Sequence, residues 1–416
     1  LADALVAPAG APAGDRAPVP PGVEDSLPAA IELLAAVGGE AGAPASMVYT
    51  LPHFGPEVAA AITAALANIA VTCSGEEAAE ALFVLPQEGN LWGMRDAGVS
   101  PELLPGHRSA GEAPARQEVE RLWGAPLPSD RGLTYEEMLA GTSLKALVVL
   151  GDNPLLLSPN QGSLRRRLGE LDLLAVIDSL ATDTAKAADV VLPDVAFYGK
   201  EGTTTSADRR ILRLHTATAP EGEAQPAWRI LGELGARLAQ RLQAAETRIS
   251  YAGPAAIMEE MAQLSPLYAD ATYRELESGA KQRLDGLGPK IARLQPVPPV
   301  APPSPAGDGF LLATGRSLYT SYEGAALHSP DADKLHREEF VEMNPADAAA
   351  LAVGDGDPVV LRRGSVELAI RVRVTAAVQP RTLYVPLYFD GGAVGVLFSG
   401  DRPVEPVTVA AGRVAQ

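Results

Sequence analysis

The stretch 189-DVVLPDVAFYGKEGTTTSADRRILRL-214 contains the most suggestive spacing of polar side chains in the chain. An aliphatic run from Asp189 ends at Pro193, and a Gly-Thr-Thr-Thr tract at 202–205 is followed by Arg209 and Arg210. Small hydroxyl residues beside basic side chains suit the binding of an anion, such as the phosphates of a nucleotide-like cofactor. The alternative is a polar loop at a sheet edge that binds nothing.

Two earlier segments have a related pattern. The segments 151-GDNP-154 and 177-IDSLATDTAKAAD-189 each follow or end an aliphatic run that predicts a buried strand. In an open α/β sheet, ligands bind outside the carboxyl ends of the strands, where backbone amides and helix N-termini favour anions. We therefore expect these segments and 201-EGTTTSADRR-210 to be loops of a cofactor crevice, with simple turn structure as the alternative.

Other patterns of catalytic residues are missing. The sequence has no Gly-x-Gly-x-x-Gly turn after a strand, no P-loop, no His-Glu-x-x-His and no Gly-x-Ser-x-Gly. Its five histidines are scattered, so a shared metal site is not expected. Cys73 is the only cysteine, which excludes an internal disulfide and a self-contained iron–sulfur cluster. Spacing alone thus predicts no catalytic residue and no metal ligand.

Length and charge restrict the class of protein. With 416 residues, 47% of them apolar, the chain suits two or three domains with real cores. A net charge of −18 argues against binding nucleic acid or an anionic membrane surface. The longest uncharged run, residues 58–75, is mostly alanine and predicts a helix followed by a strand at 68–73, so no membrane insertion is expected.

Strand and helix patterns alternate through the first two thirds of the chain. We expect strands at 47–51, 81–86, 145–150, 173–178 and 188–193, with helices at 31–37, 56–67 and 163–171 between them. Apolar residues at steps of three and four predict an amphipathic helix over one sheet face: Trp228, Leu231, Leu234, Leu238 and Leu242. This alternation predicts an α/β fold with doubly wound, mainly parallel sheets.

A proline-rich segment at 287–308 predicts a stiff linker, and the pattern changes after it. Strand patterns occur at 310–315, 318–322, 358–363, 366–374 and 382–389, with a short helix capped by Asn344 among them. These features predict a small β-barrel. The expected domains are a flexible linker at 1–27, α/β domains at 28–142 and 143–286, the linker at 287–308 and the barrel at 309–416.

In order along the chain, these segments resemble the molybdopterin oxidoreductase superfamily. The resemblance rests on Gly-x-Asn-Pro at 151–154, Asp178 with a threonine-rich turn, Ala-Asp-Val-Val-Leu-Pro at 188–193, Glu-Gly-Thr at 201–203 with Arg210, and ATGR at 313–316. It implies a carboxyl-terminal, double-psi-like barrel that binds molybdopterin dinucleotide. If the pocket is functional, it also implies these cofactor-binding residues: Gly151, Asn153, Asp178, Thr182, Glu201, Gly202, Thr203, Arg210 and Arg316.

Within that superfamily, residues 85–108 resemble the large iron–sulfur subunit of bacterial NADH–quinone oxidoreductase (respiratory complex I). Its Asn-x-x-Gly tract precedes Gly-Val-x-Pro and Leu-Pro-Gly. The chain departs from cofactor-binding members at Ser206, where they usually have Asn, and at Arg209, where they usually have Gly. An arginine at that position would bring bulk and charge into a loop that must approach the ligand.

The resemblance implies a carboxyl-terminal portion of a longer subunit. One interpretation is a scaffold that holds no cofactor, with iron–sulfur clusters in an amino-terminal region and in partner subunits that carry electrons from NADH to quinone. Its partners would be other peripheral-arm subunits of complex I, at the cytoplasmic face of the bacterial inner membrane. The alternatives are the cofactor-binding part of a working enzyme of formate dehydrogenase or nitrate reductase type, and a stand-alone nucleotide-binding module.

Overall fold

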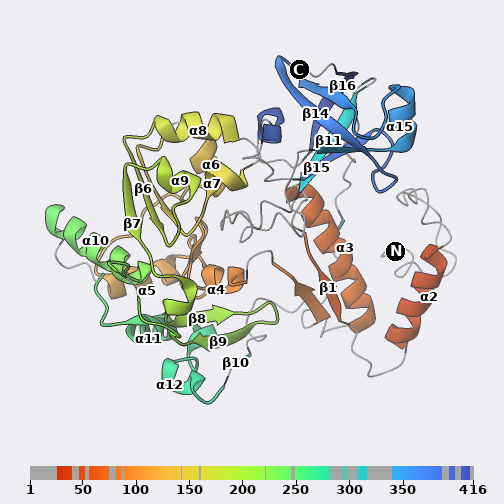
Figure 1. Cartoon of the computed structure of the whole chain (residues 1–416). Coiled ribbons are helices and arrows are strands. Elements are labelled where there is room, and N and C mark those ends of the chain that lie inside the picture. The colour runs from red at the N-terminus through yellow and green to blue at the C-terminus, as the bar shows by residue number, and fades with distance from the viewer. Residues whose placement is uncertain are drawn as a thin grey trace. The chain divides into compact units, whose positions relative to one another are not determined.

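The structure is a computed structural model of the chain (Figure 1). It describes residues 26–39, 46–51, 56–74, 81–86, 89–141, 143–158, 161–220, 222–244, 249–279, 281–282, 294, 296–297, 307, 309–315, 340–386, 393–398 and 404–412. Residues 1–25 of the expected flexible linker at 1–27, most of the proline-rich linker, the strand at 318–322 and Arg316 lie outside these residues, and residues 26 and 27 of the expected linker are helical instead.

The chain divides into two compact units, each built from segments that are distant in sequence. Unit 1 comprises Leu1–Leu122, Glu201–Leu214 and Ala252–Ala301. Unit 2 comprises Trp123–Lys200, His215–Tyr251 and Pro302–Gln416. The hairpin that contains the Gly-Thr-Thr-Thr tract therefore belongs to unit 1, whereas the strands just before it belong to unit 2.

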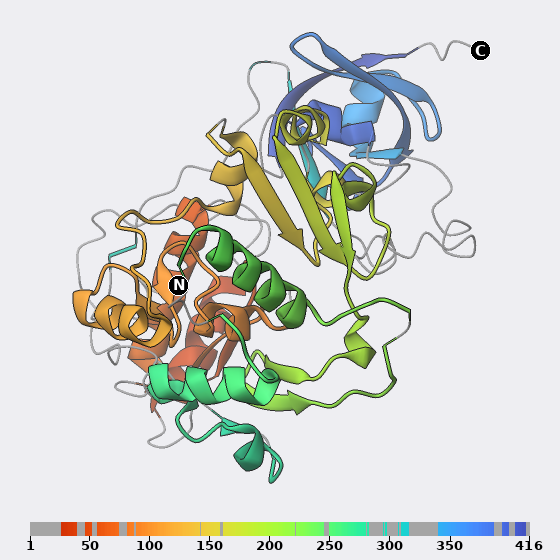
Figure 2. The same ribbon diagram turned by 90° about the vertical axis from the view of Figure 1, so that its left-hand side faces the viewer.

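A three-stranded parallel sheet forms the α/β part of unit 2. Its order is β5(Ala146–Leu150), β6(Leu173–Asp178) and β7(Val190–Pro193), and Figure 2 shows the three strands running in the same direction. The helices around it are α6(Tyr135–Ala140), α7(Pro154–Leu157), α8(Gln161–Gly169) and α9(Asp183–Lys186). All three strands were expected from their aliphatic runs.

One face of this sheet forms a core with the helices. Val149, Leu174 and Val176 pack against Leu155 of α7, Leu164 and Leu168 of α8, and Ala185 of α9. The opposite face carries exposed aliphatic side chains, among them Val148 and Leu150. The expected amphipathic helix forms as α10(Ala227–Arg241), but no described residue in it is buried. The prediction that this helix buries its apolar stripe on the sheet is therefore wrong for the residues described.

Unit 1 begins with helices around a short parallel pair of strands. α2(Ser26–Gly39) and α3(Pro56–Ser74) accompany β1(Met47–Tyr49) and β2(Leu82–Val84). The prediction of a strand at 68–73 is wrong, because helix α3 continues through these residues. Ala67, Ile69 and Ala70 of α3 are buried. Length and composition alone would allow α3 to cross a membrane, although core helices of water-soluble proteins also meet that criterion.

The rest of unit 1 surrounds an antiparallel hairpin. α4(Leu91–Asp96), the short pair β3(Leu103–Leu104) and β4(Arg108–Ser109), and α5(Ala113–Trp123) precede it. β8(Gly202–Thr205) pairs with β9(Arg210–Leu214), which also pairs with β10(Lys281–Gln282). α11(Pro254–Leu264), the 3-10 turn η3(Pro266–Tyr268) and α12(Tyr273–Leu276) complete it. The segment expected to be a loop at 201–210 is thus a strand and a tight turn.

The carboxyl-terminal part is a closed six-stranded barrel, as predicted. Its order is β11(Phe310–Gly315), β15(Thr382–Pro386), β12(Phe340–Met343), β14(Val366–Val374), β13(Pro358–Arg363) and β16(Val404–Ala411). Alternating side chains of β14 face a core that includes Ile370 and Val372, together with residues of η6(Ala393–Leu397). α15(Pro345–Ala350) begins at Asn344, whose side chain accepts a hydrogen bond from the Ala346 amide.

Candidate functional site

The carboxyl ends of β5, β6 and β7 lie at one edge of the sheet, because the strands are parallel and in register. Leu150 is paired with Ile177, and Asp178 with Pro193. Gly151 follows β5 with φ = 59° and its amide donates to the Ile177 carbonyl at 2.9 Å. No other atom lies within 4 Å of where a Cβ would stand on Gly151, so this turn leaves open space.

Asp178 is the buried carboxylate at this edge. Its Oδ1 accepts a hydrogen bond from the Leu180 amide at 2.9 Å, whereas its Oδ2 is buried and has no hydrogen-bond partner among the described residues. Burial raises the pKa of Asp178, the nearby carboxylate of Asp194 raises it further, and backbone hydrogen bonds and Lys200 oppose the rise. A buried acceptor without a donor costs about 1–3 kcal/mol, so this carboxylate would gain from a ligand that donates hydrogen bonds.

Asn153 joins two of the expected loops. Its Oδ1 accepts hydrogen bonds from the amide of Thr184 at 3.1 Å and from the Thr184 hydroxyl at 2.7 Å. That hydroxyl in turn accepts from the Leu155 amide at 3.2 Å. Asn153 and Thr184 are buried, so this contact fixes the Gly-Asp-Asn-Pro turn against the start of α9.

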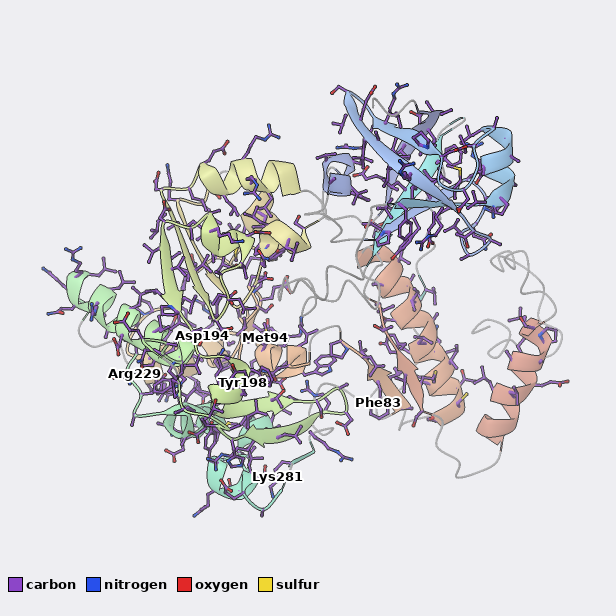
Figure 3. The ribbon with its side chains drawn as sticks, in the orientation of Figure 1. Phe83, Met94, Asp194, Tyr198, Arg229 and Lys281 are labelled. Carbon is purple, nitrogen blue, oxygen red and sulfur yellow. The ribbon has the colours of Figure 1, made fainter. Side chains whose placement is uncertain are left out.

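Thr182 and Asp194 fix the helices that begin near this edge. The Thr182 hydroxyl caps α9 by accepting from the Ala185 amide at 3.1 Å, which is the usual role of threonine before a helix. Asp194 accepts from the first amide of α10, that of Ala227, at 3.0 Å and forms an ion pair with Lys200. Figure 3 labels Asp194, which directly follows β7.

The expected residues of the Glu-Gly-Thr tract lie on the hairpin of unit 1. Glu201 precedes β8 and its Oε1 accepts a hydrogen bond from Nη2 of Arg213 at 2.7 Å. Gly202 has open space where a Cβ would stand, and Thr203 is paired across the hairpin with Arg213. Arg210 is more than half exposed and pairs with Asp208 at 2.9 Å.

A buried polar cluster in unit 1 centres on Asp96, which was not expected from the sequence. Its Oδ1 accepts a hydrogen bond from Nη2 of Arg209 at 3.0 Å and lies 3.2 Å from Nδ1 of His107. Its Oδ2 accepts from the Tyr268 hydroxyl at 3.1 Å, and that hydroxyl lies 3.2 Å from the hydroxyl of Thr205. Burial raises the pKa of Tyr268, so it remains a neutral donor. The cluster joins three segments of unit 1 that are distant in sequence.

Arg209 therefore lies differently from what the sequence suggested. Its backbone has φ = 63°, the conformation that glycine adopts most easily, so the turn keeps a glycine-like shape. The side chain is buried beside Asp96, and its guanidinium lies 4.9 Å from the ring centroid of Trp92. The charge of Arg209 is thus neutralised inside unit 1 and does not lie on the surface of the turn.

The predicted residues fall into three groups. Gly151, Asn153, Asp178 and Thr182 lie together at the sheet edge of unit 2. Glu201, Gly202, Thr203 and Arg210 lie on the hairpin of unit 1, and Arg316 lies outside the described residues. Sequence reasoning missed Asp96, Arg213 and Tyr268. The only feature of the sequence that could have pointed to these residues was the position of Asp96 in the Gly-rich tract at 85–108.

The sheet edge fits a nucleotide-like group better than a metal. The unpartnered Oδ2 of Asp178 is suited to donors such as the ring and exocyclic nitrogens of guanine, and the Gly151 turn leaves space for a ligand. Among the residues that the structure describes, no three His, Cys, Asp or Glu side chains are grouped to hold a metal ion. We therefore interpret this edge as suited to the dinucleotide part of a pterin cofactor.

Comparison with known proteins identifies two families along the chain. Residues 57–237 match the family described as Molybdopterin oxidoreductase, and residues 310–412 match the Molydopterin dinucleotide binding domain. The first match includes the sheet edge and the hairpin, and the second includes the barrel.

Three curated relatives carry names with different activities. The alpha chain of an NADPH-Fe(3+) oxidoreductase of Geobacter sulfurreducens is 33% identical over 412 residues, which are 98% of this chain and 46% of that protein. The alpha chain of an F420-dependent formate dehydrogenase of Methanocaldococcus jannaschii is 30% identical, over 78% of this chain and 50% of that protein. An NADH-quinone oxidoreductase component of Rhizobium meliloti is 31% identical, over 73% of this chain and 35% of that protein.

The chain therefore spans half or less of the length of these relatives. Among solved structures, acetylene hydratase from Pelobacter acetylenicus matches 72% of this chain and 50% of its own with a TM-score of 0.51 at 14% identity, which supports the fold alone. The barrel and the mixed α/β sheets agree with that fold. Together with the two family matches, these findings place the chain in the molybdopterin oxidoreductase superfamily.

Proposed function

We propose that this chain is the part of an oxidoreductase subunit that holds a molybdopterin dinucleotide. The observation that carries the proposal is the buried, unpartnered Oδ2 of Asp178 at the carboxyl edge of the β5–β6–β7 sheet. A buried carboxylate oxygen without a hydrogen-bond donor lowers the stability of the fold, and a bound ligand that donates hydrogen bonds to it would offset this loss.

Two further observations support a bound dinucleotide. The match to the dinucleotide-binding domain covers residues 310–412, which include the described barrel. Arg209, the departure that suggested an empty pocket, is buried against Asp96 and leaves the turn without an exposed charge at that position. When bound, a molybdopterin cofactor supplies the metal and redox chemistry, while the protein supplies binding and orientation.

This chain's residues would act by binding and positioning. Asp178 would accept hydrogen bonds from the guanine of the dinucleotide, and Asn153 would hold the neighbouring turn through Thr184. Gly151 would let the ligand approach the backbone, because its turn has no side chain to obstruct it.

Nucleotide binding tests this assignment directly. We expect the full-length subunit, freed of its cofactor, to bind a guanine nucleotide in calorimetry, and Asp178→Ala to weaken that binding by about tenfold or more because hydrogen bonds to a charged group are lost. Lys145→Gln is a matched control, since Lys145 lies on the surface just before β5 and pairs with Asp172. Equal affinity of the wild-type and Asp178→Ala proteins would remove the proposal's main support.

A second candidate function is a scaffold portion of the large iron–sulfur subunit of NADH–quinone oxidoreductase. The 31% identity to the Rhizobium meliloti protein and the tract at 85–108 favour it. In that case the chain would bind no pterin, and iron–sulfur clusters elsewhere in the longer subunit and its partners would carry electrons from NADH to quinone. Its partners would be peripheral-arm subunits at the cytoplasmic face of the bacterial inner membrane.

The two candidates differ in what co-purifies with the full-length polypeptide. The scaffold predicts other peripheral-arm subunits and iron without pterin, whereas the cofactor-binding part predicts near-stoichiometric molybdenum or tungsten with pterin. Ser206, the other departure from cofactor-binding members, has its hydroxyl engaged with Asp208 and Arg210 inside the turn.

A further inference from the structure

Two aromatic side chains are exposed on the short turn that follows β7 in unit 2. The turn is η2(Phe197–Gly199), and no described element of unit 2 covers its rings: Phe197 is 83% exposed and Tyr198 53% exposed. Their ring centroids lie 5.4 Å apart at an interplanar angle of 75°, which is an edge-to-face pair. Together they present apolar area to water that a bound molecule would cover.

The backbone of this turn is closely packed. Val195 just before it is buried, and a Cβ on Gly199 would collide with Cγ1 of Val195, so glycine is needed for the turn to close on that side chain. The Tyr198 carbonyl accepts a hydrogen bond from the Ala217 amide at 2.8 Å. The ring of Phe197 is therefore exposed on a fixed backbone.

The turn lies between two residues that act on Asp178. The Asp194 amide donates to the Asp178 carbonyl at 3.0 Å, and Lys200 forms an ion pair with the Asp194 carboxylate. After burial and backbone hydrogen bonds, the charges of Asp194 and Lys200 are the causes that shift the pKa of Asp178. Phe197 is three residues from each of them, so its Cα lies within roughly 11 Å of both of theirs. Asp194 and Tyr198 are labelled in Figure 3.

We propose that Phe197 is the surface on which the base of a bound dinucleotide stacks, with Tyr198 supporting its ring from the edge. This rests on the proposed function, in which Asp178 accepts hydrogen bonds from the edge of the same base. Every residue of this arrangement belongs to unit 2.

The chemistry of the two neighbouring groups favours a nucleobase as the occupant. A wholly apolar partner would cover the rings but would leave Oδ2 of Asp178 buried without a donor. A purine has a flat π face and carries its hydrogen-bond donors in the plane of the ring, so one base can contact an aromatic ring and a carboxylate together. Because every base has a π face, Phe197 would contribute affinity, and Asp178 would contribute the preference for guanine.

The test compares Phe197→Ala, Phe197→Tyr and the control Leu242→Ala in the full-length subunit freed of its cofactor. Leu242 is an apolar residue of unit 2 that directly follows α10 and is 75% exposed. Calorimetry measures the affinity for guanosine diphosphate, and the ultraviolet absorbance of guanine reports stacking, because it falls when the base lies on a ring. We expect Phe197→Ala to weaken binding about tenfold and to abolish the absorbance change, since one stacked base contributes about that much.

Phe197→Tyr keeps an aromatic ring and should match the wild type in both measurements, as should Leu242→Ala. Unchanged affinity of Phe197→Ala, with the wild type binding, would overturn the stacking role and leave the proposed function in place. Loss of a co-purifying protein from Phe197→Ala without any change in nucleotide affinity would also overturn it, and would assign the pair to a protein interface. A wild type that binds no guanine nucleotide would overturn the proposed function and the stacking role together.

Discussion

At the carboxyl edge of the β5–β6–β7 sheet, Asp178 keeps a buried oxygen without a partner among the described residues, whereas in the β8–β9 hairpin Arg209 and Arg213 both pair with carboxylates. The turn at Gly151 has open space beside it, whereas the side chain of Arg209 in the hairpin turn is buried against Asp96. Both regions come from segments with polar patterns that suggested cofactor loops.

This difference separates two roles that one sequence pattern can have. A region that binds a ligand keeps polar atoms unsatisfied until the ligand arrives, and this lowers the stability of the empty fold. A region that supports a ligand has its charges paired, because an unpaired buried charge would be more costly still. Nε and Nη1 of Arg209 and Nε of Arg213 in the hairpin also lack hydrogen-bond partners among the described residues, so the two regions differ in the pairing of charge rather than in unsatisfied atoms. By the pairing of charge, the hairpin fits a supporting role and the sheet edge a binding role.

The largest effect is expected at Asp96. Asp96→Asn leaves the guanidinium of Arg209 buried without a carboxylate, which should lower the free energy of unfolding by about 3–5 kcal/mol. Urea unfolding followed by tyrosine and tryptophan fluorescence measures it. Asp172→Asn removes an exposed pair with Lys145 and should cost less than about 1 kcal/mol. Equal stabilities of the two variants would contradict the view that the hairpin depends on paired charges.

A smaller loss is expected at Thr184, which supports the sheet edge. Thr184→Val removes the hydroxyl that bonds Asn153 and Leu155 while keeping the shape of the side chain. Leaving those buried groups without this partner should lower the free energy of unfolding by about 1–3 kcal/mol. Thermal unfolding of the variant and of the wild type would measure the difference, and no loss would indicate that the two groups find other partners.

Asp178→Asn should instead stabilise the cofactor-free protein at neutral pH. Its raised pKa means that the folded state disfavours the ionised carboxylate, so a protonated Asp178 favours folding below the unfolded pKa of about 3.9, and this advantage is lost as the pH rises through the higher folded pKa. The asparagine of the variant is neutral at every pH, so the variant keeps the stability that the wild type loses as Asp178 ionises. The variant should therefore melt higher than wild type at pH 7 and at nearly the same temperature near pH 3.

The same variant should bind the guanine nucleotide more weakly, because an amide accepts less strongly than a carboxylate. Gain of stability and loss of binding together would identify Asp178 as part of the ligand site. A variant that is less stable at pH 7 would show that the carboxylate is already satisfied in the fold, and would remove the distinction drawn between the two regions.

The smallest effect is expected on α10, outside both regions. Arg229 and Glu233 form an i,i+4 pair at 3.1 Å, and both side chains are more than half exposed. Figure 3 labels Arg229 on this helix. Arg229→Gln should change the free energy of unfolding by less than about 0.5 kcal/mol, as measured by urea unfolding. A loss as large as that of Thr184→Val would mean that exposed pairs contribute as much here as the buried polar contacts do.

Local patterns predicted the elements around the site well. The aliphatic runs of β5, β6 and β7 and the alternation of β14 depend on neighbouring residues only, and so does the cap at Asn344. At 68–73 the pattern misled, because Ile69, Val71 and Thr72 favour strands by a fraction of a kcal/mol each. The helix that reaches Ser74 buries Ala67 and Ile69 instead, and that packing decides the conformation.

The supporting contacts were beyond local patterns. Arg209 and Asp96 are 113 residues apart, and Tyr268 lies 172 residues after Asp96. Nothing near Arg209 in the sequence indicates that its side chain turns inward, so bulk and charge were expected on the turn. The apolar stripe of α10 is the converse case. Its spacing predicted burial, but no described residue of this helix is buried.

Whether this chain holds a cofactor is decided by the molybdenum, tungsten and pterin content of the full-length polypeptide purified from its native source, for the wild type and for Asp178→Ala. Elemental analysis and the fluorescence of oxidised pterin measure these contents. We predict near-stoichiometric metal and pterin in the wild type and a clear loss of both in the variant. Iron without pterin in the wild type would contradict a cofactor-holding role and favour the scaffold.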